Sequence, residues 1–169
     1  MNKLTFTAKD YSETSELAGL IRKIDTSDAE YVDRISDEIF KYQPFFLTVV
    51  LGYRMDISSQ EMEEMMRIYL LVWEYFKSNK NLPKKKVTPT QFEEVQRRNM
   101  YMLHYSEGES EESRDKIYTD ELQNLKSKSL WAAVHFRYNT RAVLVNMDSE
   151  NKGLILIDIL SFIQCFETQ

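Results

Sequence analysis

The chain has 169 residues, of which 43% are hydrophobic and 29% are charged, a composition typical of a globular protein. Gly occurs 4 times and Pro 3 times, which argues against collagen-like sequence, disorder and a turn-rich all-β fold. The formal net charge of −5 gives no overall attraction for nucleic acid or anionic lipid, because both require clustered Lys and Arg. We expect one acidic domain over residues 1–169.

Cysteine use and the N-terminal residues indicate the compartment. Cys165 is the only cysteine, so the chain can form neither an internal disulfide nor a cysteine zinc cage. The N-terminus lacks the apolar segment of a signal peptide, and the apolar residues 68–73 fall far short of the ~20 that span a bilayer. These features predict a cytoplasmic protein without a membrane span.

Apolar residues spaced three and four apart predict helices in the first third of the chain. The first covers about residues 10–23, and the second covers about residues 28–42, after a run of oxygen-bearing side chains suited to an N-cap. Pro44 suits the first turn of a third helix that ends at Gly52. A buried helix is our preferred interpretation of the apolar residues 45–51, and a strand is the alternative.

The strongest helical pattern begins at Ser58, which forms a capping-box sequence with Glu61 and continues to Phe76. Its polar residues fall on one narrow stripe, so we expect the other helices to pack around it. Leu70 and Leu71 lie near that stripe and are either core residues or part of an interface.

The second half of the chain is also predicted to be helical. A basic linker at 78–88 leads to a helix that begins at Pro89, and an acidic loop at 107–113 separates it from a helix at 116–126. Further helices are expected from Leu130 to about Val145 and from about residue 149 to 166. A β-hairpin that pairs residues 142–145 with 154–157 is the alternative. The expected fold is all-α, a bundle of about six to eight helices around residues 58–76.

The sequence contains no motif of a metal, nucleotide or hydrolase site. The residues three positions before the two histidines are Tyr101 and Ala132, so the Glu-x-x-His pairs of di-metal bundles are absent. Cys165 lies among apolar residues, which favours a buried, inert thiol over a nucleophile assisted by His135 and Asp158. We therefore expect no metal and no cofactor, and the sequence assigns no catalytic residue.

Four charged residues are candidates for a pocket between helices. Glu74 and Asp158 each interrupt a strongly apolar helix, where a carboxylate can acquire the raised pKa of an acid or base. Arg137 and Arg141 are the candidate partners. A ligand site requires all four to converge on one cavity, whereas the alternative is that the two acids face solvent or form ion pairs.

A second candidate site is a local basic patch. It comprises Lys84, Lys85, Lys86, Arg97 and Arg98. Tyr101 and Tyr105 follow at helical spacing, and basic groups interleaved with aromatic groups can hold a phosphate backbone and stack a base. The alternative is a solvated loop and an ordinary helix surface.

The function expected from these observations is a non-catalytic, cytoplasmic interaction or regulatory module. Its partner would be another protein or a second copy of the chain, bound through a Met- and Tyr-containing helix face. Met62, Met65 and Met66 are the methionines of that face, and the alternative is that they fill the core. Two other functions remain as alternatives: a small-ligand binder or enzyme with an inter-helix pocket, and a nucleic-acid binder.

Overall fold

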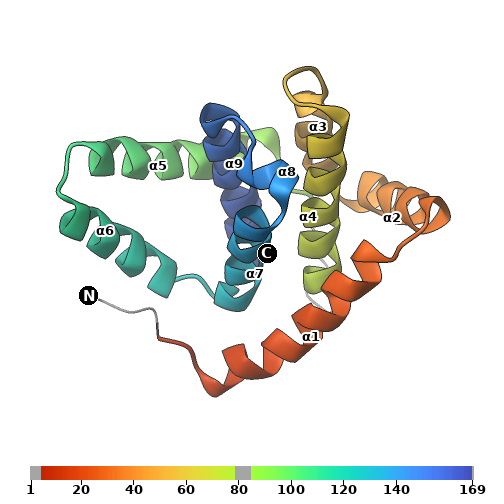
Figure 1. Ribbon diagram of the computed structural model, residues 1–169, viewed down its shortest axis with the longest axis horizontal. Helices are drawn as coiled ribbons and strands as arrows, with labels where there is room; N and C mark the ends of the chain where they lie inside the picture. Colours follow the sequence, from red (N-terminus) through yellow and green to blue (C-terminus); the bar gives the residue numbers. More distant parts are fainter. Residues whose placement is uncertain (1–4, 79–84, 169) are drawn as a thin grey trace.

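The computed structural model describes residues 5–78 and 85–168, and all regular structure in these two ranges is helical (Figure 1). The elements are α1 (Ala8–Asp25), α2 (Ala29–Tyr42), α3 (Pro44–Gly52), the 3-10 helix η1 (Tyr53–Met55), α4 (Ser59–Ser78), α5 (Pro89–Glu107), α6 (Glu111–Gln123), α7 (Lys128–Thr140), α8 (Ala142–Val145) and α9 (Ser149–Glu167). The all-α prediction is therefore confirmed. The described chain has no hairpin at its C-terminal end, because residues 142–145 are α8 and residues 154–157 lie inside α9.

Side-chain caps fix the starts of several helices, as the sequence predicted. Asp28 accepts a hydrogen bond from the backbone N–H of Tyr31 at 2.9 Å and so begins α2. At α4 the backbone N–H of Ser58 donates to Glu61 Oε2 at 2.7 Å, and the Glu61 N–H donates to Ser58 Oγ at 3.2 Å. This reciprocal pair is the predicted capping box.

The second half of α4 is buried on every side, from Ile68 to Phe76. Leu70 and Leu71 are each 1% exposed, so they belong to the core rather than to an interface. Of the three methionines at its start, Met65 is buried, while Met62 and Met66 are half-buried. Helices α1, α3, α7, α8 and α9 contact α4, which explains this burial.

Aromatic rings from several helices meet at Phe162 of α9. Its ring centroid lies 4.3 Å from that of Phe92 in α5, 4.8 Å from that of Phe46 in α3 and 6.2 Å from that of Tyr69 in α4. Tilted and edge-on arrangements at such distances are favourable for aromatic pairs. This cluster joins the C-terminal helix α9 to α3, α4 and α5.

Helices α5 and α6 form an arm on one side of the molecule (Figure 1). The inner face of α5 packs along α9, where the Asn99 side-chain amide donates to Ser161 Oγ and Gln164 Oε1, both at 2.9 Å. By contrast, α6 has no fully buried residue and packs mainly on α5. The end of α6 returns to the N-terminal residues, since Thr5 Oγ1 lies 3.3 Å from Gln123 Oε1.

The structure shortens the predicted acidic loop at 107–113 to residues 108–110. Helix α5 continues to Glu107 and α6 begins at Glu111, so only three residues separate them. Ser110 caps α6 by accepting from the Ser113 N–H at 3.2 Å, and Glu111 with Glu112 forms the first turn. Acidic side chains at a helix N-terminus are stabilised by the helix dipole, which is the reason that this run is helical.

The predicted helix from Leu130 to Val145 is also interrupted. Arg141 has extended backbone (φ −83°, ψ 115°), which ends α7, and α8 follows as one short turn. Val145, the last residue of α8, is 46% exposed. The interruption allows the Arg141 side chain to bind the end of α1, as described below.

Candidate functional site

The four predicted pocket residues lie in three separate polar clusters. Arg137 and Arg141 meet at the end of α1, whereas Glu74 lies further along α4 and binds other partners. Asp158 binds residues of η1 and α5. The structure therefore brings together the two arginines but not the two carboxylates.

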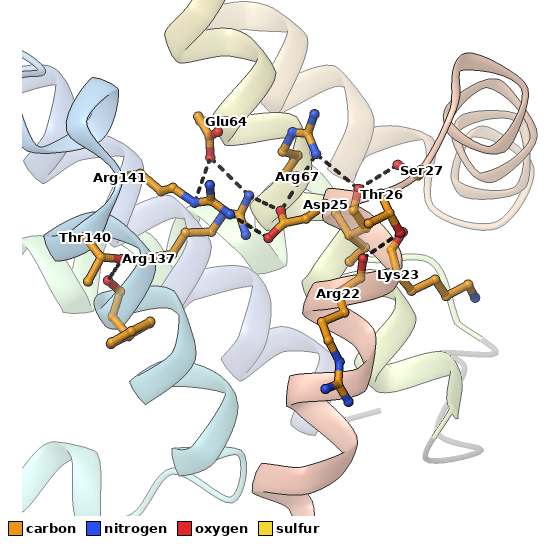
Figure 2. A network of polar contacts seen from close by, with 12 residues as sticks. Arg22, Lys23, Asp25, Thr26, Ser27, Glu64, Arg67, Arg137, Thr140 and Arg141 are labelled. Carbon is orange, nitrogen blue, oxygen red and sulfur yellow. Dashed lines mark hydrogen bonds and ion pairs between the residues drawn. The ribbon is translucent and has the colours of Figure 1, made fainter.

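The arginines belong to an ion cluster that joins α1, α4 and α7 (Figure 2). Arg137 Nη2 lies 2.6 Å from Asp25 Oδ1 and 3.1 Å from Glu64 Oε2, and Arg141 Nη2 lies 2.5 Å from Asp25 Oδ2. Arg67 binds Glu63 at 2.7 Å and the Ile24 carbonyl at 3.1 Å. Each arginine is thus neutralised by a carboxylate, and the cluster holds helices together.

Glu74 is 5% exposed and ties α4 to α1 and α2. The Tyr31 hydroxyl donates to Glu74 Oε1 at 3.0 Å, and Lys23 Nζ lies 3.5 Å from Oε2. The pKa of the Tyr31 phenol is raised, mainly by burial and secondly by the negative charge of Glu74. This carboxylate has structural partners on both oxygens.

Asp158 is 3% exposed and accepts hydrogen bonds from the Tyr53 hydroxyl and from Gln96 Nε2, the latter at 2.5 Å. Burial raises its pKa, and the two hydrogen bonds oppose that rise. The buried hydroxyls of Tyr69 and Tyr138 have no hydrogen-bond partner within the described ranges. Asp158 is therefore a buried carboxylate held by hydrogen bonds from η1 and α5.

The thiol and imidazole groups do not have the properties of an activated nucleophile and base. Cys165 is fully buried, and this burial raises the pKa of its thiol to about 11, opposite to the shift that a thiolate nucleophile requires. His135 is half-buried on α7, where desolvation lowers its pKa. Within residues 5–78 and 85–168, no three His, Cys, Asp or Glu side chains are grouped so as to hold a metal ion.

The basic patch is exposed where the structure describes it, although Lys84 lies outside the described residues. Lys85 and Lys86 precede α5, and Arg97 and Arg98 are exposed on that helix. Tyr101 and Tyr105, also on α5, are 69% and 68% exposed. None of the helices that the structure describes is long and apolar enough to cross a membrane.

Two hollows that sequence reasoning missed lie on either side of α6. The first, which we call the Trp131 groove, has a volume of about 230 Å³ and is almost wholly apolar. It is lined by Phe6, Leu122, Leu125, Lys128, Trp131, Ala132 and His135. The Trp131 and His135 rings meet edge to face at 4.6 Å. Lys128 Nζ lies 3.4 Å from both the Thr5 carbonyl and Gln123 Oε1, so it holds the N-terminal segment beside α7.

The second, which we call the α5–α6 hollow, has a volume of about 350 Å³ and is lined by polar and apolar groups. It is lined by Arg98, Asn99, Met102, Ile117, Asp120, Glu121 and Asn124. Arg98 belongs to the predicted basic patch. Asp120 and Glu121 lie on α6, for which the sequence pattern predicts a helix but no functional residue. Opposite charges therefore share one hollow.

Comparison of the chain with protein-family models, with curated proteins and with solved structures finds no match.

Proposed function

We propose that the chain is a non-catalytic, cytoplasmic interaction module, a single domain organised around α4, which binds a protein partner through the Trp131 groove. The observation that carries this proposal is the apolar lining of the groove, where Trp131 and Leu125 are buried and Phe6 remains 39% exposed. Exposed, contiguous apolar surface is typical of interaction sites. Phe136, one helical turn after Ala132, is 67% exposed and extends this surface along α7.

The size of the groove favours a side chain of a protein over a free small molecule. Its volume of about 230 Å³ is below the ~300–1,000 Å³ of typical small-molecule pockets. A space of this size accommodates one bulky apolar side chain, and such anchors supply much of the binding energy at protein interfaces. The partner therefore presents a large apolar residue, with polar contacts confined to the rim near Lys128.

Photocrosslinking from the groove tests this proposal. A benzophenone amino acid at Ala132, which is exposed and lines the groove, should crosslink a discrete partner in cell extract. The matched control carries the same probe at Asn139, which is exposed on the same helix but does not line the groove. In a pull-down with the chain free of probe, Ala132→Glu should abolish capture of the same partner, because it places a charge in an apolar site, whereas Asn139→Glu should not.

The outcomes separate a foreign partner from a second copy of the chain. Crosslinked dimers, together with a dimer mass in native mass spectrometry, would identify the chain itself as the partner. Equal capture from positions 132 and 139, or capture unaffected by Ala132→Glu, would contradict a role for the groove.

The nucleic-acid alternative is supported by one exposed row on α5. Arg97, Tyr101 and Tyr105 are spaced four residues apart, and all three are exposed, as sequence-independent binding of a single strand requires. The test is titration with a single-stranded oligonucleotide at several salt concentrations. Binding that weakens steeply with salt and is lost in Arg97→Glu with Tyr101→Ala would support it, and binding that does not change with salt would remove it.

A further inference from the structure

We propose that the α5–α6 hollow binds a free basic α-amino acid. The hollow contains one guanidinium, from Arg98, and two carboxylates, from Asp120 and Glu121. A basic amino acid carries the complementary set: one carboxylate and two cationic groups. The volume of about 350 Å³ lies at the small end of the range for ligand pockets, as a metabolite of this size requires.

The three charges of the hollow are not neutralised by the protein. Arg98, Asp120 and Glu121 form no side-chain ion pair within 4 Å in the part of the chain that the structure describes. The ion cluster at the end of α1 is different, since each of its arginines binds a carboxylate of the protein. The groups of the hollow therefore keep their charge for a ligand.

The chemistry of each group assigns its contact with the ligand. The guanidinium of Arg98 presents a planar pair of donors that matches a carboxylate. Asp120 and Glu121 accept from the α-ammonium and the side-chain cation. Because the hollow has two negative groups and one positive group, a basic amino acid neutralises it, whereas an acidic amino acid increases the imbalance.

The remaining lining residues fit the rest of such a ligand. Met102 and Ile117, both half-buried, provide apolar contact for the methylene chain of a basic side chain. The side-chain amide of Asn99 donates both of its hydrogens to residues of α9. Its buried Oδ1 has no hydrogen-bond partner among the described residues. Because this oxygen is closed off from solvent, Asn99 anchors the wall of the hollow to α9 and leaves the ammonium groups of the ligand to Asp120 and Glu121.

Isothermal titration calorimetry of the full chain with L-lysine and three relatives tests the proposal. Cadaverine lacks the carboxylate, 6-aminohexanoate lacks the α-ammonium, and L-glutamate reverses the side-chain charge. We expect L-lysine to bind most tightly, each truncated compound to bind at least about tenfold more weakly, and L-glutamate not to bind, since each truncation removes a charge-assisted hydrogen bond. No binding of L-lysine at millimolar concentration, or equal affinity for L-lysine and cadaverine, would overturn the proposal.

Matched variants locate the binding. Arg98→Gln should weaken L-lysine binding at least about tenfold, whereas Arg97→Gln, at the neighbouring exposed position outside the hollow, should not. On α6, Asp120→Asn should weaken binding and the exposed control Asp115→Asn should not. Equal effects of the two members of either pair would contradict this site. Ala132→Glu in the Trp131 groove should leave lysine binding unchanged, so the two proposals fail independently.

Discussion

Arg137 and Arg141 bind the same carboxylate, Asp25, but differ in burial. Their side chains are 5% and 43% exposed. We expect Arg137→Met to lower the free energy of unfolding by about 3 kcal/mol, because it leaves Asp25 and Glu64 without their buried partner. Arg141→Met should cost less than about 1 kcal/mol, since water solvates the exposed pair in its place. Urea unfolding of both variants measures the difference.

A double-mutant cycle separates the ion pair from the packing of the arginine stem. If Arg137 acts through Asp25, the cost of Arg137→Met should shrink in the Asp25→Asn background. Equal costs for Arg137→Met and Arg141→Met in the wild-type background would show that burial does not determine the strength of these pairs.

Asp158 gives the protein a specific dependence of stability on pH. Burial raises its pKa above the ordinary value of 3.8, so just above that pH the folded protein retains a proton that the unfolded chain releases. The free energy of unfolding therefore falls as pH rises from the unfolded pKa through the folded one. Asp158→Asn cannot ionise, and its amide can still accept from Tyr53 and donate to a rotated Gln96.

We expect the stability of Asp158→Asn, relative to wild type, to improve as pH rises from about 3 to about 7. Urea unfolding across that range measures this difference. Tyr53→Phe should enlarge the pH dependence, since it removes a hydrogen bond that lowers the pKa of Asp158. A difference between wild type and Asp158→Asn that is constant with pH would show that Asp158 keeps its ordinary pKa in the folded state.

At the residue scale, the sequence indicates which side chains are unusual but not what they bind. Glu74 and Asp158 are recognisable because each interrupts an apolar helix. Their hydroxyl partners, Tyr31 and Tyr53, are 43 and 105 residues away, and helical spacing carries no information on such contacts. Both carboxylates are buried. Neither binds Arg137 or Arg141, the partners that the sequence suggested, and Glu74 instead lies 3.5 Å from Lys23.

Phe162 determines how four helices pack, so its substitution tests the element scale. We expect Phe162→Ala to lower the free energy of unfolding by about 3–5 kcal/mol, because it opens a cavity that Phe46, Phe92 and Tyr69 line. Leu154→Ala is the control on the same helix, at a position that is 40% exposed, and should cost at most about 1 kcal/mol. Comparable costs from thermal or urea unfolding would contradict the central position of Phe162.

Helix positions could be predicted where local chemistry determines them. The caps at Asp28 and Ser58 depend on residues three positions apart, and the structure contains both. The start of α6 was missed because Glu111 and Glu112 were interpreted as a solvated loop. The end of α7 was missed because Arg141 leaves the helix at a position where it binds Asp25, which lies 116 residues earlier in the sequence.

At the scale of the whole molecule, both hollows depend on how separate segments of the chain pack against each other. The Trp131 groove needs Phe6 against residues 122–135, and the α5–α6 hollow needs two helices to fold back on each other. Leu122, Leu125 and Trp131 each appear in the sequence as ordinary core positions of a helix. A periodic pattern identifies the buried face of each helix. It does not show where packed helices leave a hollow between them, because that depends on the packing of the whole chain.

The uneven packing of the helices predicts a hierarchy of local opening. Helices α4 and α9 contain long buried stretches, whereas α6 has no fully buried residue and packs mainly on α5. Amide hydrogens of α6 should therefore exchange through local opening, at rates nearly independent of low urea concentrations. Those of α4 and α9 should exchange only through global unfolding, at rates that rise with urea.

Hydrogen exchange with mass spectrometry across a urea series measures this hierarchy. Because α6 forms one side of both hollows, a ligand in either should slow its exchange before it changes that of α4. Helix α5 provides an internal comparison, since Phe92 and Asn99 are buried and should be protected more strongly than any residue of α6. If the amide hydrogens of α6 exchange as slowly as those of α9 without ligand, the prediction of local opening is wrong and α6 is a rigid part of the core. A ligand could then cause no further slowing of exchange in α6.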